Sequence, residues 1–489
     1  MNPRDLKYEI GFNDVTYTDC NEKTKFSPDM AADAVIERFD LVQDGSSIWQ
    51  YDNGVYRPDG EIVVNQTLDR VAKDMYNIHA TRETIHKIRI RTPRIDRFNP
   101  DPYLFGVSNG VVDLRTGDVR DYTREDLITL RSPIKYFEDA ECPNIEKFFN
   151  EIAEHPDDVK VLIDLFVAAA ISKSMRKFYA LIGSGKNGKG VLQKLINSFF
   201  GADQITSVQL ATLNKNVFAY GNICNKRIIS NGEVQVTKLE SENIKRITGG
   251  DLIWTDVKNK NALQFYPFAI PIFDTNNPPK FRDTSGGFKE RMISLNFPYQ
   301  FVTNPDPNNP REKKRDMDLS EKLTTPQELA GLLNWIIRRA PEMIKEGEPY
   351  RRLGEEETAS RYDKQSHTVI SFFEDFTEYD TSGWSQNEGG FVPTKYLYKF
   401  YAEYCANLGV GAESERSFGL FMGKRGLNLR GGRKRGIVDP GTGKVNNDQL
   451  SGFFCVYFKY LKFIHAIPTS KLLPMEPIRS VQDEIEAIA

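Results

Sequence analysis

The sequence predicts an α/β fold built on a parallel sheet. The apolar run 178–182 ends in a glycine-rich loop, and helical spacing follows the loop until Gly201. Beyond this unit, segments typical of strands and helices alternate, as a parallel sheet requires. Two later apolar runs end at polar side chains, Glu233 and Asn276, and ligands of open α/β sheets bind at the carboxyl ends of strands. These observations place a candidate ligand site at residues 183–191.

Length and composition limit the classes of protein. The chain has 489 residues, which predicts two to four domains. Hydrophobic residues make up 39% and charged residues 27%, which is typical of globular rather than disordered proteins. No apolar run is long enough to span a bilayer and the N-terminus has no signal-peptide core, so we expect a cytoplasmic protein without membrane contact. The net charge of −3 does not indicate nucleic-acid binding, although such binding needs only a local basic patch.

The five cysteines are scattered along the chain. They form no C-x-x-C pair and have no neighbouring histidine at ligand spacing. We therefore expect neither a zinc site nor a disulfide framework, but buried free thiols at Cys20, Cys142, Cys224, Cys405 and Cys455.

Residues 1–143 are predicted to form a small mixed α/β accessory domain. The aromatic run 48–56 contains the turn dipeptide Asn53-Gly54 and predicts a hairpin, and a helix is expected at 64–75. A second hairpin is predicted at 104–114 around Asn109-Gly110. The first 45 or so residues show no pattern that indicates chemistry.

Residues 144–303 are predicted to form the central domain. Two helical segments, of which 159–172 is strongly apolar, lead into the strand at 178–182. After the glycine-rich loop we expect a strand at 227–230, a helix at 239–248, a hairpin made of 252–257 and 262–268, and a buried strand at 268–276.

The loop after the first strand nearly spells the phosphate-binding motif G-x-x-x-x-G-K-[ST]. Glycines let backbone N–H groups turn onto phosphate oxygens, and the helix N-terminus adds its positive end. Lys189 would reach the terminal phosphates of ATP, whereas Gly190 replaces the Ser or Thr whose hydroxyl helps to hold Mg²⁺. A turn between a buried strand and a helix would also use glycine. The predicted ATP-binding residues are Gly183, Ser184, Gly185, Lys186, Asn187, Gly188, Lys189, Gly190 and Val191.

The last third of the chain divides into three predicted parts. Residues 304–380 are a helical extension in which a charged surface loop at 304–315 precedes helices at 326–346 and 367–379. Residues 381–465 contain helices at 394–408 and 414–424, a glycine-rich basic hairpin and an apolar strand at 453–458, which is the order expected of a winged helix. Residues 466–489 are a tail.

Six motifs in this order resemble those of the superfamily 3 helicases of the phage and poxvirus primase-helicase family, over roughly residues 49–458. They are SNGVVDL at 108–114, GSGKNGK at 183–189, ITGGD at 247–251, DTNNPP at 274–279, ERM at 290–292 and ELAGLLNW at 328–335. The resemblance implies an AAA+ ATPase core with a parallel sheet, an N-terminal accessory domain and a C-terminal winged helix. It also implies a ring hexamer that hydrolyses ATP at subunit interfaces and moves along single-stranded DNA, typically 3′ to 5′.

The resemblance assigns four catalytic roles. Lys189 neutralises charge on the β and γ phosphates, Glu233 orients or deprotonates the attacking water, and Asn276 senses the γ phosphate. Arg291 is the finger that completes the neighbouring subunit's site. From the residues alone, Glu233 and Asn276 also suit turn or capping roles, and Arg291 is one arginine among many.

Two departures from the family pattern concern Mg²⁺. Gly190 lacks the usual hydroxyl, and Gly232 precedes Glu233 where related sites often carry a second acid. Mg²⁺ can be held mainly by nucleotide phosphates plus one carboxylate, so Glu233 is a candidate ligand and no protein ligand is certain. Asp274 and Thr275 are close enough in sequence to Asn276 to be considered as substitutes.

Two basic segments are candidate DNA contacts. Lys258 and Lys260, at the tip of the hairpin, would line the channel of a ring, although a basic turn also suits a solvent-exposed loop. The stronger candidate is a glycine-rich patch without acids, which predicts phosphate contacts to duplex or forked DNA. It comprises Lys424, Arg425, Arg430, Arg433, Lys434 and Arg435. The aromatic residues between 396 and 404 have helical spacing and predict core packing rather than base stacking.

The sequence thus predicts an ATP-dependent DNA helicase that replicates a virus, phage or plasmid-like element as a homo-oligomeric ring, with ATP and Mg²⁺ as cofactors, in the host cytoplasm. Its partners would be single-stranded and forked DNA and a separate primase or polymerase, because fewer than about fifty residues precede the first predicted hairpin of the accessory domain, too few for a primase core. The alternative is a DNA-binding replication initiator or loader that binds ATP for assembly with weak or no hydrolysis, which Gly190 and Gly232 favour. A small-molecule phosphotransferase fits less well, because the basic wing is present and no substrate-lid pattern is found.

Overall fold

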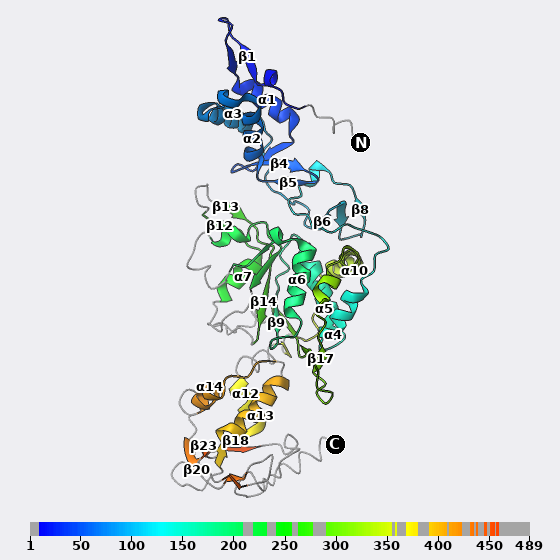
Figure 1. The fold of residues 1–489 in the computed structure, drawn as a ribbon, viewed down its shortest axis with the longest axis vertical. Coiled ribbons are helices and arrows are strands. Elements are labelled where there is room, and N and C mark those ends of the chain that lie inside the picture. The colour runs from blue at the N-terminus through cyan, green and yellow to red at the C-terminus, as the bar shows by residue number, and fades with distance from the viewer. Residues whose placement is uncertain are drawn as a thin grey trace.

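The structure, a computed structural model, describes residues 9–208, 219–231, 241–256, 263–276, 290–354, 357–358, 368–379, 391–407 and 410–422, and the strands 431–434, 437–438, 445–446, 450–454 and 456–458. Figure 1 shows three regions along the long axis. Helices and hairpins up to α3 lie at one end, a sheet with helices lies in the middle, and the elements from α12 onward lie at the other end. The glycine-rich loop belongs to the middle region.

The central sheet has five strands, all parallel, in the order β10, β11, β14, β9, β15. This confirms the predicted α/β fold with a parallel sheet. Their bounds are β9 (Phe178–Ile182), β10 (Ile205–Thr206), β11 (Ile228–Asn231), β14 (Ile270–Thr275) and β15 (Met292–Asn296). The order places β14 directly beside the strand that leads into the glycine-rich loop.

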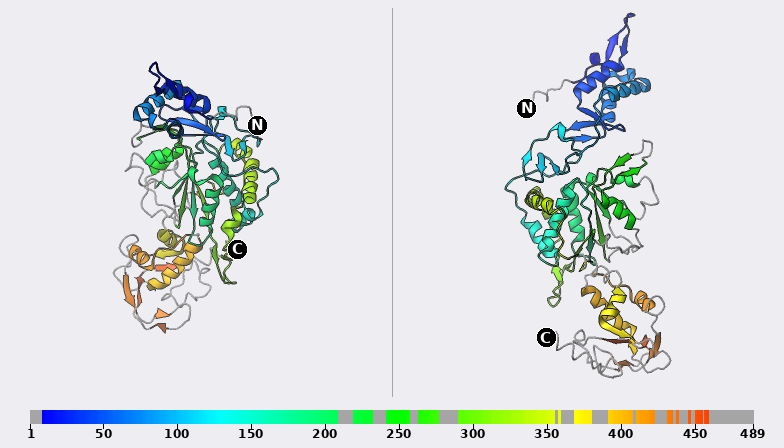
Figure 2. Two further views of the ribbon diagram at one scale, coloured as in Figure 1. Left: turned by 45° about the horizontal axis from the view of Figure 1, so that its top comes forward. Right: turned by 180° about the vertical axis from the view of Figure 1, so that it is seen from behind.

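Alternate residues of β9 pack on opposite faces of the sheet. Tyr179 and Leu181 share a core with the helices of one face, whereas Phe178, Ala180 and Ile182 share a core with α7 on the other. Because both faces are covered, all five residues are buried, which explains the continuous apolar run. The first face carries α4 (Pro143–Ile152), α5 (Asp158–Ala170), α6 (Lys189–Phe200), α9 (Leu319–Leu323) and α10 (Pro326–Glu346), and α7 (Ser241–Gly249) lies on the second, as Figures 1 and 2 show.

The N-terminal region has its own core. It comprises β1 (Thr16–Thr18), β2 (Thr24–Phe26), α1 (Pro28–Arg38), β3 (Leu41–Gln43), β4 (Ile48–Asp52), β5 (Val55–Arg57), α2 (Gly60–Ala72) and α3 (Ile78–Arg91). The predicted hairpin at 48–56 is confirmed, and its turn residues Asn53 and Gly54 have φ of 47° and 95°. The predicted helix at 64–75 is confirmed in place, but it begins at Gly60 and ends in a 3-10 turn, Lys73–Met75.

The second predicted hairpin packs on the central region. β6 (Leu104–Val107) pairs antiparallel with β7 (Gly110–Asp113), and β8 (Val119–Arg120) adds a third strand. Phe105, Val107, Val112 and Leu114 belong to the core of α4, α5, α6 and α10. The boundary predicted at residue 143 stays a prediction, but these strands share the core that follows it.

The motif at 328–335 fastens α10 to the segment before α4. The Glu328 carboxylate accepts from the amides of Asn144 and Ile145 at 3.1 and 3.0 Å, and so caps α4. Asn334 Nδ2 donates to the carbonyls of Phe137, Glu138 and Ala140, each at 2.9 Å. A Cβ on Gly331 would lie 2.3 Å from the backbone carbon of Glu141, so only glycine allows this approach. We call residues 328–334 with their partners at 137–145 the α10 latch.

The elements after β15 depart from the predictions in four places. β17 (Glu312–Lys314) lies inside the predicted surface loop at 304–315 and pairs with β16 (Gln300–Val302). The predicted helix at 367–379 ends early: α12 (Thr368–Phe376) is followed by β18 (Thr377–Tyr379), because these three residues pair with the distant β24 (Val456–Phe458) and tertiary pairing overrides local spacing. α14 (Glu415–Leu420) begins one residue later than predicted and passes into a π-helical turn at 421–422, and residues 423–424 lie outside the described residues. The apolar strand expected at 453–458 is two strands, β23 (Leu450–Phe454) and β24.

The C-terminal region otherwise follows the predicted order. α13 (Thr394–Asn407) precedes α14, and β23 pairs antiparallel with β19 (Phe391–Pro393) and β20 (Gly431–Lys434). A further pair joins β21 (Ile437–Val438) and β22 (Val445–Asn446). Tyr396, Tyr401 and Tyr404 are buried, which confirms core packing of the aromatic run.

The described cysteines are free, but not all are buried. Cys142 and Cys405 are buried, whereas Cys224 is half-buried and Cys20 is exposed. The prediction for Cys20 was wrong because this residue lies in the turn between β1 and β2, where no second layer covers it. Cys455 lies outside the described residues. In the part of the chain that the structure describes, no helix combines the length and apolar character needed to cross a membrane.

Candidate functional site

The glycine-rich loop, Gly183 to Gly188, is fastened on both sides. Its first amide, of Gly183, donates to the carbonyl of Thr275 at 3.2 Å, and the Lys186 carbonyl accepts from the amide of Phe301 at 2.7 Å. Gly188 has φ of 93°, and a Cβ there would lie 2.7 Å from Ile152 of α4. The loop therefore has a fixed path between β14, β16 and α4. Gly185, Lys186 and Gly190 remain exposed on its open side.

Lys189 is the first residue of α6 and is buried. Its Nζ lies 3.2 Å from Oδ1 of Asp274 and donates to the carbonyls of Gly183 and Thr275, the latter at 3.3 Å. All three oxygens belong to the carboxyl ends of β9 and β14. The amine thus adds a positive charge to the positive end of α6.

Asn187 carries an unusual amide. Its side chain is 3% exposed, and its Oδ1 accepts from the backbone amide of Lys189 at 3.4 Å. Among the described residues, its Nδ2 finds no hydrogen-bond partner. A buried donor left unpaired costs about 1–3 kcal/mol, so an acceptor supplied by a ligand would stabilise the loop.

Of the two predicted strand-end residues, the structure describes Asn276 but not Glu233. Asn276 follows the last residue of β14, is half-buried, and its carbonyl accepts from the amide of Gly411 at 3.3 Å. Glu233 lies two residues past β11 and outside the described residues, so its approach to the loop stays a prediction. β11 and β14 are parallel neighbours, so both strands end at the same edge of the sheet as β9.

Arg291 lies at the amino ends of the parallel strands, whereas the loop lies at their carboxyl ends. Arg291 precedes β15, whose first residue Met292 pairs with Phe178 at the start of β9, whereas the loop follows the end of β9. At ~3.3 Å per residue, the length of β9 separates Arg291 from the loop by roughly 15 Å. The Arg291 guanidinium donates to the Lys245 carbonyl and to Thr248 Oγ1, both at 2.8 Å. Burial, and after it the nearby Arg176, lowers the pKa of Arg291.

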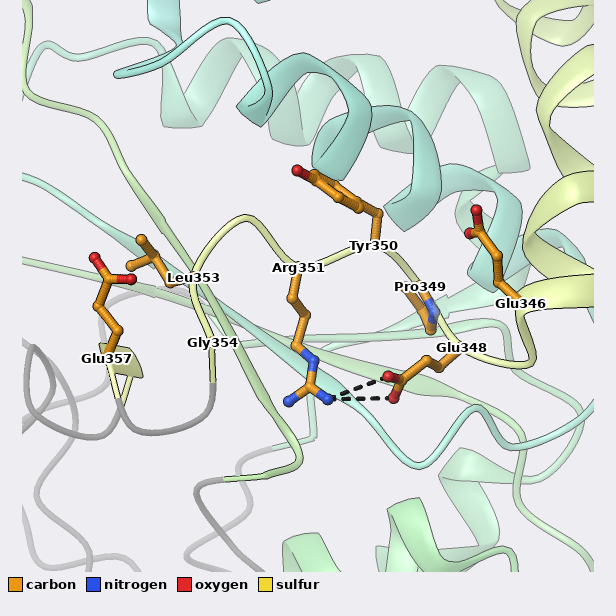
Figure 3. Close-up of a pocket in the computed structure, with 8 residues that line it drawn as sticks. All are labelled: Glu346, Glu348, Pro349, Tyr350, Arg351, Leu353, Gly354 and Glu357. Carbon is orange, nitrogen blue, oxygen red and sulfur yellow. Dashed lines mark hydrogen bonds and ion pairs between the residues drawn. The ribbon is translucent and has the colours of Figure 1, made fainter.

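Two cations hold the backbone next to Arg291. Lys177 Nζ and Arg351 Nη1 donate to the Glu290 carbonyl at 3.2 and 3.1 Å, and both side chains also pair with Glu348. A hollow of about 830 Å³ lies beside them, lined by residues between Glu346 and Glu357 (Figure 3). It lies at the ends of the strands opposite the loop, and we assign no chemistry to it.

The predicted DNA contacts fall mostly outside the described residues. β12 (Ile253–Thr255) and β13 (Leu263–Phe265) form the predicted hairpin, but its tip with Lys258 and Lys260 is not described. Of the basic patch, only Arg433 and Lys434 lie within the described residues, as backbone of β20. Lys424, Arg425, Arg430 and Arg435 lie outside it. These contacts stay predictions.

The sequence analysis assigned no definite role to Asp274, which the structure pairs with Lys189. A signal was present, because Asp274 lies near the end of a predicted buried strand, where a charged side chain needs a partner. It also missed the clamp of Lys177, Glu348 and Arg351, which joins positions more than a hundred residues apart and leaves no local pattern.

Two family models match parts of the chain. One, described as D5 N terminal like, matches residues 32–154. The other, a family of unknown function (DUF5906), matches residues 181–291, from the end of β9 to Arg291. Each covers well under half of the chain.

Two curated viral proteins are similar to this chain. It is 27% identical over 297 residues to a candidate helicase of Acanthamoeba polyphaga mimivirus, and 24% identical over 238 residues to a candidate primase of African swine fever virus. The alignments cover 56% and 45% of this chain but only 30% and 25% of the relatives, so the chain matches less than a third of their length. The D5-like segment and these relatives support the resemblance to phage and viral primase-helicases.

Two solved structures of the C-terminal region of NrS-1 superpose on the chain with TM-scores of 0.44 and 0.41. They are 11% and 12% identical and cover 87% and 88% of this chain and 98% and 99% of theirs. TM-scores below 0.5 do not establish a common fold, so the fold is described from this chain's own strands.

Proposed function

We propose that this chain is an ATP-dependent DNA helicase that serves the replication of a virus, phage or plasmid-like element. One observation carries the proposal: Lys189, Asp274 and the unpaired buried amide of Asn187 meet at the carboxyl edge of a parallel sheet, around a glycine loop that opens a helix. The relatives named as helicase and primase support a role in replication. In this proposal the central region is a superfamily 3 AAA+ core, and the elements from α13 to β24 are a winged helix.

The proposed ATP site uses electrostatic positioning rather than covalent chemistry. Lys189 would exchange its carbonyl and carboxylate partners for the β and γ phosphates, and the amides of residues 183–191 would receive phosphate oxygens. Asn276 would position the attacking water, and Glu233 would orient it or accept its proton. Asn187 Nδ2 would donate to a phosphate oxygen and so lose its unpaired state.

The position of Arg291 supports a site shared between subunits. The loop lies at one edge of the sheet and Arg291 at the other, so Arg291 cannot serve the loop of its own chain without a large rearrangement. In a head-to-tail ring, by contrast, one edge of each subunit faces the opposite edge of the next. A homo-oligomeric ring, a hexamer by the resemblance, would bring Arg291 to the neighbour's phosphates.

The proposed DNA contacts lie at two ends of the central region. A short segment joins β13 to the start of β14, so the hairpin lies near the amino ends of the strands, as Arg291 does. The Gly411 amide donates to the carbonyl of Asn276, so the C-terminal region lies near the carboxyl ends of the strands, as the loop does. We propose that the hairpin tip, Lys258 and Lys260, contacts the phosphates of single-stranded DNA inside the channel of the ring. The basic patch would hold forked DNA, and a separate primase or polymerase would supply the primer.

A second function has specific support. The absence of a hydroxyl at Gly190 and of a second acid at Gly232 favours an initiator or loader that binds ATP for assembly and turns it over slowly. Both functions use the same phosphate loop, so only turnover separates them.

The decisive measurement is ATP hydrolysis with and without single-stranded DNA, for the parent chain, Lys189→Ala and Lys194→Ala. Lys194 lies on the same helix and is exposed, so it is the matched control. The helicase proposal expects DNA-stimulated turnover that Lys189→Ala lowers by about a hundredfold or more and that Lys194→Ala leaves intact. Tight ATP binding without turnover in the parent would instead select the initiator.

The shared site is tested by mixing two inactive variants. Arg291→Ala subunits retain a complete loop, and Lys189→Ala subunits retain the finger, so mixed rings contain some intact interfaces. Activity that reappears on mixing supports the ring, and its absence at every mixing ratio contradicts it.

A further inference from the structure

One carboxylate faces the phosphate loop from the strand beside it. Asp274 lies opposite Leu181 in the register of β14 and β9, one residue before the end of β14. Its Oδ1 lies 3.2 Å from Lys189 Nζ, and a third of its side chain is exposed, whereas the Lys189 side chain is almost fully buried. The carboxylate therefore connects the buried lysine with the open side of the loop.

Position 190, where related loops carry a Ser or Thr hydroxyl, is a glycine in this chain. Gly190 is exposed, and a Cβ built on it meets no atom of the described residues within 4 Å. Among the described residues, no group of three or more His, Cys, Asp and Glu side chains could hold a metal ion. A metal at this edge would therefore depend on the nucleotide, and Mg²⁺ is commonly held by substrate phosphates with one or two carboxylates.

The charge of the Asp274 carboxylate should affect the binding of ATP differently with and without Mg²⁺. Once Lys189 pairs with phosphates, the Asp274 carboxylate lies beside a polyanion, and like charges repel strongly in a partly buried site. A divalent cation between the carboxylate and the phosphates turns this repulsion into attraction. The same residue would thus oppose bare ATP and favour ATP that carries Mg²⁺.

We infer that Asp274 is the protein ligand, directly or through a bound water, for the Mg²⁺ that accompanies the nucleotide, in place of the hydroxyl that Gly190 lacks. The inference rests on the proposed ATP site. The ion pair with Lys189 is the arrangement that both side chains give up when they take the metal and the phosphates.

The test is equilibrium binding of a non-hydrolysable β,γ-imido analogue of ATP to the full chain, in Mg²⁺ and in EDTA. In Asp274→Asn, the ratio of the two affinities should fall by about tenfold or more relative to the parent, because binding in EDTA is unchanged or tighter and binding in Mg²⁺ is weaker. If Asp274 only holds Lys189, both affinities change by the same factor, and that outcome overturns the inference. Glu154→Gln is the matched control, since Glu154 is a carboxylate paired with Arg352 and Asn296, the last residue of β15.

A rescue sharpens the test. Among the described residues, no atom lies within 4 Å of a Cβ at position 190, so Gly190→Ser can restore the missing hydroxyl. In the Asp274→Asn background, Gly190→Ser should recover the Mg²⁺ effect on affinity, and failure to recover any of it would count against the metal role. If Asp274→Asn does not fold, Asp274→Ala carries the same test because it also removes the carboxylate. An unchanged affinity ratio in Asp274→Ala would contradict the inference.

The two proposals can fail separately. If the parent binds the analogue no better than Lys189→Ala does, the ATP site itself is wrong. If Lys189→Ala abolishes binding but Asp274→Asn keeps the full Mg²⁺ effect, the ATP site stands and only the role of Asp274 is lost.

Discussion

The glycine-rich loop and the α10 latch both contain a buried asparagine and glycines, and both belong to the motifs of the same resemblance. In the latch, Asn334 donates to three carbonyls and Gly331 touches the backbone of Glu141. In the loop, the Asn187 donor is unpaired among the described residues, and a Cβ on Gly185 or Gly190 meets nothing within 4 Å. The difference shows that a sequence motif can have either of two roles, to hold the fold together or to bind a ligand. Satisfied polar groups and filled space indicate a structural motif, whereas unsatisfied donors and open space indicate a ligand.

The largest expected effect on stability comes from Asn334→Ala. The change leaves three carbonyls without their donor, and unpaired buried polar groups cost about 1–3 kcal/mol. We expect the free energy of unfolding to fall by about 3 kcal/mol in a urea titration, with nucleotide affinity of the folded protein unchanged. Asn197→Ala, on the exposed side of α6, is the control and should change it by less than about 0.5 kcal/mol. If both substitutions lowered the free energy of unfolding equally, the hydrogen bonds of Asn334 would not stabilise the latch.

Gly331→Ala should destabilise by about 2 kcal/mol. Overpacking against backbone costs up to about 3 kcal/mol, and alanine returns about 1 kcal/mol through its better helix propensity. The measurement is again urea unfolding. A stabilised Gly331→Ala would mean that α10 and the segment before α4 do not approach as closely as described.

Gly185→Ala is the counterpart in the loop. In the part of the chain that the structure describes, no atom lies within 4 Å of its added Cβ, so stability should change by less than about 0.5 kcal/mol. Nucleotide affinity should fall by about tenfold, because the methyl group fills space that a phosphate would use and about 1.4 kcal/mol of binding is lost. Titration with ADP checks the affinity, and an unchanged value would show that the space beside Gly185 does not receive the ligand.

The smallest effect concerns Glu346 at the end of α10. A hydrogen bond from Arg339 lowers the pKa of Glu346 below its ordinary value of 4.5. A carboxyl with a lowered folded-state pKa stabilises the fold above its ordinary pKa, and this contribution is lost as the pH falls through the folded-state pKa. The parent should lose stability as the pH falls below about 4.5, and Glu346→Gln should lose less. We expect the two losses in free energy of unfolding to differ by less than about 1 kcal/mol, because the Glu346 side chain is nearly half exposed. Nucleotide affinity at pH 7 should not change, and a change would connect α10 with the loop.

Much of the fold was predictable because local patterns carry it. The buried strands at 178–182 and 227–230, the two Asn-Gly hairpins and the helix at 326–346 follow from periodicity and turn chemistry, and the structure has them in these places. The glycine-rich loop lies between β9 and α6 as predicted for the same reason, since its glycines and Lys189 are contiguous in the chain.

The failures have one cause, which is pairing between distant segments. Residues 377–379 become a strand because they pair with 456–458, and β17 forms because it pairs with β16. The buried Arg227 is a further case: its guanidinium donates to Gln204 and to the last carbonyls of α5, and it lies over Phe105 at 4.9 Å. Burial lowers the pKa of Arg227 to about 9, so it remains a cation at neutral pH. No local pattern shows that this arginine joins three segments of the core.

By itself, the sequence determined the α/β class and the place of the glycine-rich loop that ends at Lys189, because these depend on contiguous residues. Only the tertiary structure decided that Asp274 stands beside Lys189, that the motif at 328–335 is a latch, and that Arg291 lies at the far edge of the sheet. These depend on strand order and on which polar groups find partners, and both are set by residues far apart in the chain.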